Sequence, residues 1–192
     1  MLPYVIINVA MSLNGKISSL EGRYSISNSI DMERVMSIRK NVDAVLLGAN
    51  TVIIDNPVLN FANKRIILDE KLRLNSNYNI FDGKIKTYIF SKNNNKTINN
   101  AEIIILNDLS IKNILKKIYD MGIKKILVEG GANVINQFIK EKIFNEFYIF
   151  VNPGLILNGV SLFNNNEIKF NYKVSMEGIG ILLNINDIYI RL

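Results

Sequence analysis

Short runs of apolar residues, many of them bounded by Gly, Asn, Asp or Lys, recur along the chain. Runs of this length between turn-forming residues are typical of buried β-strands. The pattern therefore predicts strands over residues 4–9, 44–47, 65–68, 86–90, 102–106, 126–128 and 147–151.

Apolar residues at helical spacing occur between these runs. Ser29 is expected to cap a helix over residues 30–40. The inner face of that helix should carry Met32, Val35 and Met36. A second helix is expected to open at Asp108 or Ser110 and to end at Gly122. Its apolar positions are Ile111, Leu115, Ile118 and Tyr119.

Two further segments complete the predicted architecture. Residues 49–59 form a loop or a short helix that Pro57 terminates. Residues 170–190 look like an antiparallel pair of strands turning near Gly178 and Gly180. Strands that alternate with helices and end in a hairpin predict an α/β fold, with a mostly parallel sheet covered on both faces and an antiparallel edge.

The stretch KILVEGGANVINQFI, residues 125–139, carries the strongest functional signal. A buried strand ends in Glu129, breaks at Gly130 and Gly131, and restarts as a helix at Asn133. Two glycines let the backbone approach a ligand closely, and a helix start offers free N–H groups that suit a phosphate. Open sheets bind ligands at the carboxyl ends of their strands, where this loop and the loop at Gly48 are expected to lie.

Composition removes several classes of chemistry. The chain has 192 residues, 48% of them apolar, which predicts one domain over residues 1–192 with a substantial core. It has no His and no Cys, so Ser-His-Asp triads, thiolate nucleophiles, disulfides and the usual zinc sites are impossible. No acidic cluster stands out for a magnesium site. No run is long enough to cross a bilayer and no signal peptide is evident, so a soluble, cytoplasmic protein is expected.

The net charge of +6 does not by itself indicate nucleic acid. The lysines are scattered among Asp and Glu, and no dense basic block has aromatic residues interleaved. A mildly basic protein that binds small polyanions fits this distribution equally well.

Three segments in order resemble the reductases of riboflavin biosynthesis, which share a dihydrofolate-reductase-like fold. They are PYVIINVAMSLNGKIS, GANTVIIDNPVL and ILVEGGANVINQF, and the resemblance runs over nearly the whole chain. The zinc deaminase domain often fused to this reductase is not expected within these residues, because no His or Cys could supply its zinc ligands. The resemblance implies a homodimer that reduces 2,5-diamino-6-ribosylamino-4(3H)-pyrimidinone 5′-phosphate to the ribitylamino product with NADPH. The cofactor would supply the hydride, and the protein would mainly align the reactants.

The resemblance also implies roles for individual residues. Glu129 and Asp31 are the expected catalytic carboxylates, handling the proton during ring opening and imine formation. Glu129 also faces the substrate, Arg39 is expected to bind its phosphate, and Leu59 is a further substrate contact. Cofactor contacts are expected from Ala10, Ser25, Thr51, Asp55, Glu70, Arg73, Gly130, Gly131, Ala132 and Asn133.

Each assignment has a structural alternative. Glu129 could be a carboxylate bonded to nearby backbone N–H groups, and Arg39 could form a surface ion pair. Asp31 in a first helical turn suits the helix dipole, and Asp55 could close an Asx-turn. The glycine pair could serve an ordinary strand-to-helix turn.

Several positions depart from the family pattern. Asn14 replaces an Asp, and Ala62 stands near the place of an expected arginine, for which Lys64 or Arg65 could substitute. Glu70 replaces a serine beside the adenosine 2′-phosphate; a carboxylate there repels that phosphate and favours NADH through the ribose hydroxyls. Offsetting cations for Glu70 are expected from Lys71 and Arg73.

Three other functions remain open from the sequence. The enzyme could act on the deaminated 5-amino-6-ribosylaminouracil 5′-phosphate or on another pterin or pyrimidine. The fold could also belong to a non-catalytic nucleotide-binding protein. A role in binding nucleic acid is the most distant of the three.

Overall fold

The computed structural model describes residues 1–21, 25–163 and 167–191, and the chain folds around a nine-stranded sheet. The elements follow the chain in this order: β1 Tyr4–Ser12, β2 Lys16–Ser19, α1 Ser29–Lys40, β3 Ala44–Gly48, α2 Ala49–Asp55, β4 Arg65–Leu68, the 3-10 helix η1 Asn79–Phe81, β5 Thr87–Ser91, β6 Ala101–Ile105, α3 Ile111–Asp120, β7 Lys125–Gly130, α4 Ala132–Glu141, β8 Glu146–Asn152, β9 Gly159–Ser161, β10 Glu167–Glu177 and β11 Gly180–Arg191.

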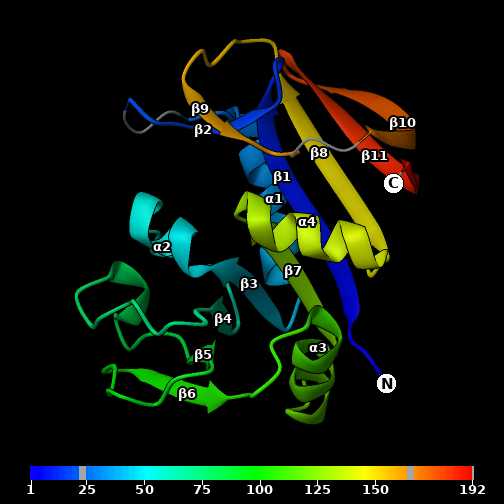
Figure 1. The fold of residues 1–192 in the computed structure, drawn as a ribbon. Coiled ribbons are helices and arrows are strands. Elements are labelled where there is room, and N and C mark those ends of the chain that lie inside the picture. The colour runs from blue at the N-terminus through cyan, green and yellow to red at the C-terminus, as the bar shows by residue number, and fades with distance from the viewer. Residues whose placement is uncertain (22–24, 164–166, 192) are drawn as a thin grey trace.

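The sheet is mostly parallel, as predicted. Its strand order is β10-β11-β8-β1-β7-β3-β4-β5-β6. Strands β8, β1, β7, β3, β4, β5 and β6 pair in parallel, whereas β11 runs antiparallel to both β8 and β10. The predicted C-terminal hairpin is therefore confirmed and forms one edge of the sheet (Figure 1).

Two apolar cores lie on opposite faces of this sheet. One core joins β1, β7 and β8 to the inner faces of α3 and α4. The other packs α2, the segments after it and part of α1 against the opposite face. Figure 1 shows α4 in front of the central strands and α1 behind them. Among the described residues, no helix combines the length and the apolar character needed to cross a bilayer.

The first helix differs from its prediction in two details. Asn28 rather than Ser29 is the N-cap, because the Asn28 side chain accepts a hydrogen bond of 2.8 Å from the Asp31 amide. The inner face buries Asp31 and Val35, while the methionines at the neighbouring inner positions are only half-buried. A charged residue at a core position is the first sign that α1 covers a polar site.

Strands β2 and β9 were not predicted from the sequence. They form a separate two-stranded antiparallel sheet. Both are short and rich in Ser, Lys and Gly, so neither carries the apolar run that identifies a strand.

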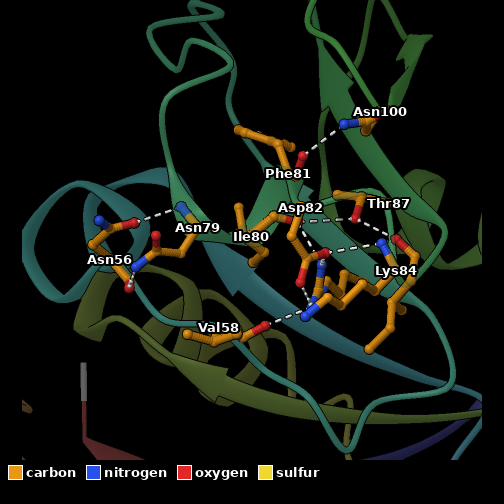
Figure 2. A network of polar contacts seen from close by, with 11 residues as sticks. Asn56, Val58, Asn79, Ile80, Phe81, Asp82, Lys84, Thr87 and Asn100 are labelled. Carbon is orange, nitrogen blue, oxygen red and sulfur yellow. Dashed lines mark hydrogen bonds and ion pairs between the residues drawn. The ribbon is translucent and has the colours of Figure 1, made fainter.

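A buried arginine at the start of β4 forms hydrogen bonds to two loops, the one after α2 and the one around η1. The Arg65 side chain is 0% exposed, and its Nη1 donates to Asp82 Oδ1 at 2.8 Å and to the Ile80 carbonyl at 2.6 Å. Its Nη2 donates to the Val58 carbonyl at 2.5 Å. Figure 2 shows Val58, Ile80 and Asp82 converging on this guanidinium. Arg65 thus cannot replace the missing substrate arginine, because it is enclosed and both of its terminal nitrogens hold loops.

A second set of hydrogen bonds in Figure 2 connects the same two loops at the surface. Asn56, which adopts a left-handed conformation after α2, accepts a hydrogen bond from the Asn79 amide through its side chain. The Asn79 side chain donates back to the Asn56 carbonyl at 3.1 Å. Together with Arg65, this pair fixes the segment that leaves α2.

Asp82→Asn is expected to lower the free energy of unfolding by about 3 kcal/mol, because the buried guanidinium loses its carboxylate. The hydrogen bond from Arg65 holds the pKa of Asp82 below its usual value. A depressed pKa means that the pair stabilises the fold above the pKa of unfolded Asp and that this stabilisation is lost as pH falls through the depressed value. Urea unfolding at decreasing pH should show the difference between variant and wild type shrinking.

Glu102→Gln is the matched control for this experiment. It breaks the ion pair between Lys86 and Glu102, whose side chains are 55% and 50% exposed. Exposed pairs add little to stability, so this variant should unfold like the wild type. Equal losses in the two variants would show that burial of Arg65 has no special role.

Candidate active site

The carboxyl ends of β1, β7, β3, β4 and β5 lie along one edge of the sheet, because these neighbouring strands are parallel. Strand β3 ends at Gly48 and strand β7 at Gly130, and Leu47 is the register partner of Gly130. The expectation that both glycine loops lie at strand ends is confirmed. A Cβ built on Gly48 would lie 2.9 Å from Val134 Cγ2 and 3.6 Å from the Gly131 nitrogen. The two loops therefore touch.

Helix α4 starts directly at this junction. The Gly131 carbonyl accepts the Val134 and Ile135 amides at 3.0 and 3.1 Å, and the helix begins at Ala132, one residue before the predicted start. No side chain in the described part of the chain caps this N-terminus, so the first amides of the helix are available to an anion. The Gly130–Gly131 peptide is cis.

Thr51 of α2 faces the glycine pair from the other side. A Cβ on Gly131 would lie only 3.0 Å from Thr51 Oγ1, so any larger residue would fill this space. Gly48, Gly130, Gly131, the first turn of α4 and Thr51 form what we call the glycine cradle. Its donor set consists of main-chain N–H groups and one hydroxyl, which fits a diphosphate without any charged side chain.

Glu129 precedes the cradle and pairs with Arg39. Arg39 Nε donates to Glu129 Oε1 at 2.7 Å, and Nη2 donates to Oε2 at 2.8 Å. The side chains are 19% and 10% exposed, so the pair is mostly shielded from water. Glu129 thus binds a guanidinium rather than backbone amides, and Arg39 forms an ion pair that is part-buried rather than fully at the surface. Two residues expected to hold substrate thus hold each other in the free protein.

Asp31 belongs to a second buried charge cluster under α1. Its side chain is 0% exposed, and Arg34 Nη2 donates to Asp31 Oδ1 at 2.6 Å and to Asn8 Oδ1 at 2.7 Å. The Arg34 guanidinium lies 5.4 Å from the centre of the Tyr148 ring. Burial, and then the hydrogen bond to Glu146, raise the pKa of Tyr148 to about 12, so this hydroxyl remains a neutral donor.

The sequence interpretation missed Arg34, Asn8 and Tyr148. Arg34 follows Asp31 by three residues, the spacing at which helical side chains meet, and this was the available signal. The other two residues come from β1 and β8, where Asn8 and Tyr148 are register partners. Asn8 also lies one residue beyond the pairing of Ile7 with Val128, which places it beside Glu129. The polar face under α1 therefore runs continuously from Glu129 to Tyr148.

Glu70 and Arg73 lie farther along the same edge. Glu70 Oε1 is 2.7 Å from Lys92 Nζ, a residue not considered in the sequence interpretation, and this hydrogen bond lowers the pKa of Glu70. Arg73 Nη2 donates to Asn50 Oδ1 at 2.7 Å, so α2 holds that guanidinium in place. Lys71 adds a smaller favourable charge to Glu70. Lys92 is thus the principal cation that offsets Glu70.

Three of the remaining predicted contact residues belong to, or lie near, the elements that form the site, and the fourth does not. Ala10 lies on β1 opposite Phe150, and Leu59 is buried in a left-handed conformation in the segment that Arg65 anchors. Asp55 is the last residue of α2, the helix that brings Thr51 to the cradle. Ser25 stands apart: it is exposed, and its hydroxyl donates to the Ser27 carbonyl at 3.3 Å.

Asn14, which departs from the family pattern, has a clear structural role. Its Nδ2 donates to the Ile156 carbonyl at 2.9 Å, and its Oδ1 accepts the Ile156 amide at 3.2 Å. An aspartate carboxylate cannot supply the first of these bonds. Asparagine at this position therefore lacks the charge of an aspartate but makes two hydrogen bonds, one donated and one accepted. They connect the loop after β1 to the loop after β8.

The chain is similar to several known proteins. The model of the RibD C-terminal domain family matches residues 3–181. The riboflavin biosynthesis protein RibD of Aquifex aeolicus is 30% identical over 174 residues, which cover 83% of this chain and 49% of that protein. This chain therefore spans about half the length of that relative. The 2,5-diamino-6-ribosylamino-4(3H)-pyrimidinone 5′-phosphate reductase of Methanothermobacter thermautotrophicus is 25% identical, with 81% of this chain and 80% of that protein covered.

A solved structure shows the same fold. The deaminase and 5-amino-6-(5-phosphoribosylamino)uracil reductase of Thermotoga maritima superposes with a TM-score of 0.83 at 24% identity, covering 96% of this chain and 56% of that chain. The predicted fold class, dihydrofolate-reductase-like with a mostly parallel sheet and antiparallel C-terminal strands, is confirmed.

Gly48→Ala is expected to destabilise the fold by about 1–3 kcal/mol, because the new methyl group overlaps Val134 at the start of α4. Val134→Ala in the same chain should recover part of that loss by removing the clashing atom. A double-mutant cycle of urea unfolding measures the coupling between the two sites. Strictly additive losses would contradict the close approach of β3 to α4.

Proposed function

The chain belongs to the family of RibD C-terminal domains, and from this premise we propose that it is a nicotinamide-dependent reductase of riboflavin biosynthesis. The proposed substrate is 2,5-diamino-6-ribosylamino-4(3H)-pyrimidinone 5′-phosphate, and the product is its ribitylamino counterpart. The observation that carries this proposal is the Arg39–Glu129 pair beside the glycine cradle. It places one cation for a phosphate ester and one carboxylate for proton transfer next to a main-chain anion site.

The cradle fits a dinucleotide diphosphate, because glycines open the space and the start of α4 supplies N–H donors. A bound reduced nicotinamide would supply the hydride that C1′ of the substrate accepts. NADPH is the proposed donor, with NADH as the alternative. Gly130, Gly131, Ala132 and Asn133 would hold the diphosphate, with Thr51 opposite them.

The protein's own contribution begins with Arg39. A guanidinium binds phosphate oxygens with two parallel hydrogen bonds, so a phosphate ester competes with Glu129 for the same donors. When Arg39 turns to the phosphate, the Glu129 carboxylate loses its counter-ion and becomes able to accept a proton. Substrate binding and activation of Glu129 are coupled in this way.

Proton transfer follows from the substrate's chemistry. Opening of the ribosylamine ring moves the proton of the bridging N–H to the ring oxygen and leaves an imine at C1′. Glu129 is the proposed carrier of that proton. Asp31 is proposed as the second acid; its Oδ2 has no hydrogen-bond partner among the described residues, while Arg34 holds its Oδ1. Reduction of the imine then needs one hydride at C1′ and one proton at nitrogen.

The proposal predicts that the purified protein consumes NADPH when the diaminopyrimidine substrate is added. Loss of the absorbance of the reduced nicotinamide measures the rate, and the same assay with the deaminated pyrimidine identifies which form is used. The deaminated compound is the second candidate, because the similar protein of Thermotoga maritima is named as a uracil reductase. Absence of oxidation with both pyrimidines and both nicotinamides would contradict the proposed reaction.

Glu129→Gln separates the reductase from a non-catalytic nucleotide-binding protein. Turnover should fall by about 100-fold or more, because the proton carrier is lost. Binding of ribose 5-phosphate, measured by calorimetry, should become tighter, because Arg39 no longer has a competing carboxylate. Glu33→Gln, on the exposed side of α1, removes the same charge and should change neither quantity. Unchanged turnover in the Glu129 variant would contradict the role of Glu129 as proton carrier, whereas a wild type that binds nucleotide without any turnover would favour the non-catalytic alternative.

We also propose that the protein is a homodimer that uses the β10 edge. Tyr172, Val174 and Met176 alternate along this strand, so they share one face, and they are 51%, 58% and 68% exposed. Ile181, the register partner of Met176, is 37% exposed. A stripe of apolar side chains on an edge strand is a surface that soluble proteins normally cover.

Val174→Asp is expected to break this association, because it places a charge in the middle of the stripe. Light scattering should give about twice the chain mass of 21.8 kDa for the wild type and the single mass for the variant. Lys173→Asp is the control, since neighbouring residues of a strand point to opposite faces. A wild-type protein that remains monomeric at all concentrations would contradict the dimer.

A further inference from the structure

Glu70 and Lys92 are held together by the backbone as well as by their charges. The Glu70 carbonyl accepts the Lys92 amide at 3.1 Å and the Ser91 hydroxyl at 3.0 Å. The Asp69 amide donates to the Phe90 carbonyl at 3.0 Å. The ends of β4 and β5 are thus connected beyond their last register pair, and the side-chain contact of 2.7 Å rests on this frame.

The charges around this contact balance: three cations lie among three carboxylates. Lys71 and Arg73 are on the same turn as Asp69 and Glu70, and the charge of Lys92 helps to lower the pKa of Asp108, so that exposed carboxylate is also nearby. Asp69 is buried and its Oδ2 accepts the Leu74 amide, so it closes the turn instead of facing solvent. Glu70 and Asp108 are the outward carboxylates of this group, and Lys92 forms its ion pair with Glu70.

This charge group lies within reach of the glycine cradle. Only β3 separates β7 from β4, so the cradle and the end of β4 are about 10 Å apart along the edge. The reacting end of a dinucleotide must face Glu129 and the surface under α1, on the β1 side. The adenosine half then extends in the other direction, towards the ends of β4 and β5.

We propose that Lys92 is a specificity-determining residue that selects NADPH over NADH. An acidic residue at this kind of strand end binds the hydroxyls of the adenosine ribose, whereas a cation accommodates a 2′-phosphate. Lys92 cancels the repulsion from Glu70 and supplies a donor for that phosphate, with Lys71 and Arg73 beside it. This inference rests on the proposed function, because it assigns the adenosine end of the same cofactor.

The test compares two nucleotides that differ only in the 2′-phosphate: adenosine 2′,5′-bisphosphate and adenosine 5′-monophosphate. Calorimetry with the full chain should show that the wild type binds the bisphosphate about tenfold more tightly or better. Lys92→Ala should lose about tenfold of that preference and leave the monophosphate affinity unchanged. Glu70→Gln should increase the preference, because it removes the opposing charge and frees Lys92.

Lys86→Ala is the matched control. Lys86 forms an ion pair of the same 2.7 Å length with Glu102, and its side chain is 55% exposed against 45% for Lys92. The control removes the same positive charge near the amino end of β5 and should keep the full preference. The effect of Lys92→Ala should also shrink as salt is raised, since exposed charges are screened.

Several outcomes would overturn the inference. Lys92→Ala could bind both nucleotides like the wild type, weaken both equally, or lose no more preference than Lys86→Ala. A wild type that binds both nucleotides with the same affinity would refute the role of Lys92 and leave the proposed reductase intact. If the wild type binds neither nucleotide nor either reduced cofactor, the proposed function fails together with this inference.

Discussion

The close contact between the carboxyl ends of β3 and β7 is the constraint on which the site depends. Adjacent parallel strands are about 4.8 Å apart, so the chain segments that leave them compete for the same space. Here Gly48 and Gly131 resolve that competition by having no side chain, and Val134 and Thr51 pack directly against them. Because the backbone itself occupies these strand ends, main-chain N–H groups are the main donors of the glycine cradle, with the Thr51 hydroxyl beside them.

Charged groups around the ends of these strands form ion pairs. How deeply each pair is buried differs with the role that it has. Arg65 is enclosed at the start of β4, at the opposite end of the strand from the site, and together with Asp82 it holds loops. Arg39 with Glu129 is mostly shielded yet lies beside the cradle, so a phosphate can displace one partner. An exposed pair such as Glu70 with Lys92 costs little to open, which suits a contact that must exchange partners with a ligand.

In the proposed mechanism, this pairing prepares an acid–base group in a chain without His or Cys. The guanidinium orients the carboxylate that it holds, and the proposal makes that carboxylate available when the guanidinium binds phosphate instead. The geometry under α1 extends this arrangement, because Arg34 orients Asp31 from three residues along the same helix and Asn8 fixes Arg34 from β1.

The amino-acid sequence by itself determined the parallel sheet, the C-terminal hairpin and the glycine cradle, because each has a local signal: an apolar run, a turn or a glycine pair. It did not determine Asn28 as the cap of α1 or the strands β2 and β9, whose polar residues give no periodic pattern. The pairings of Arg39 with Glu129 and of Glu70 with Lys92 were decided only by the tertiary structure. Their partners are 90 and 22 residues apart, and strand order, which no local pattern encodes, brings them together.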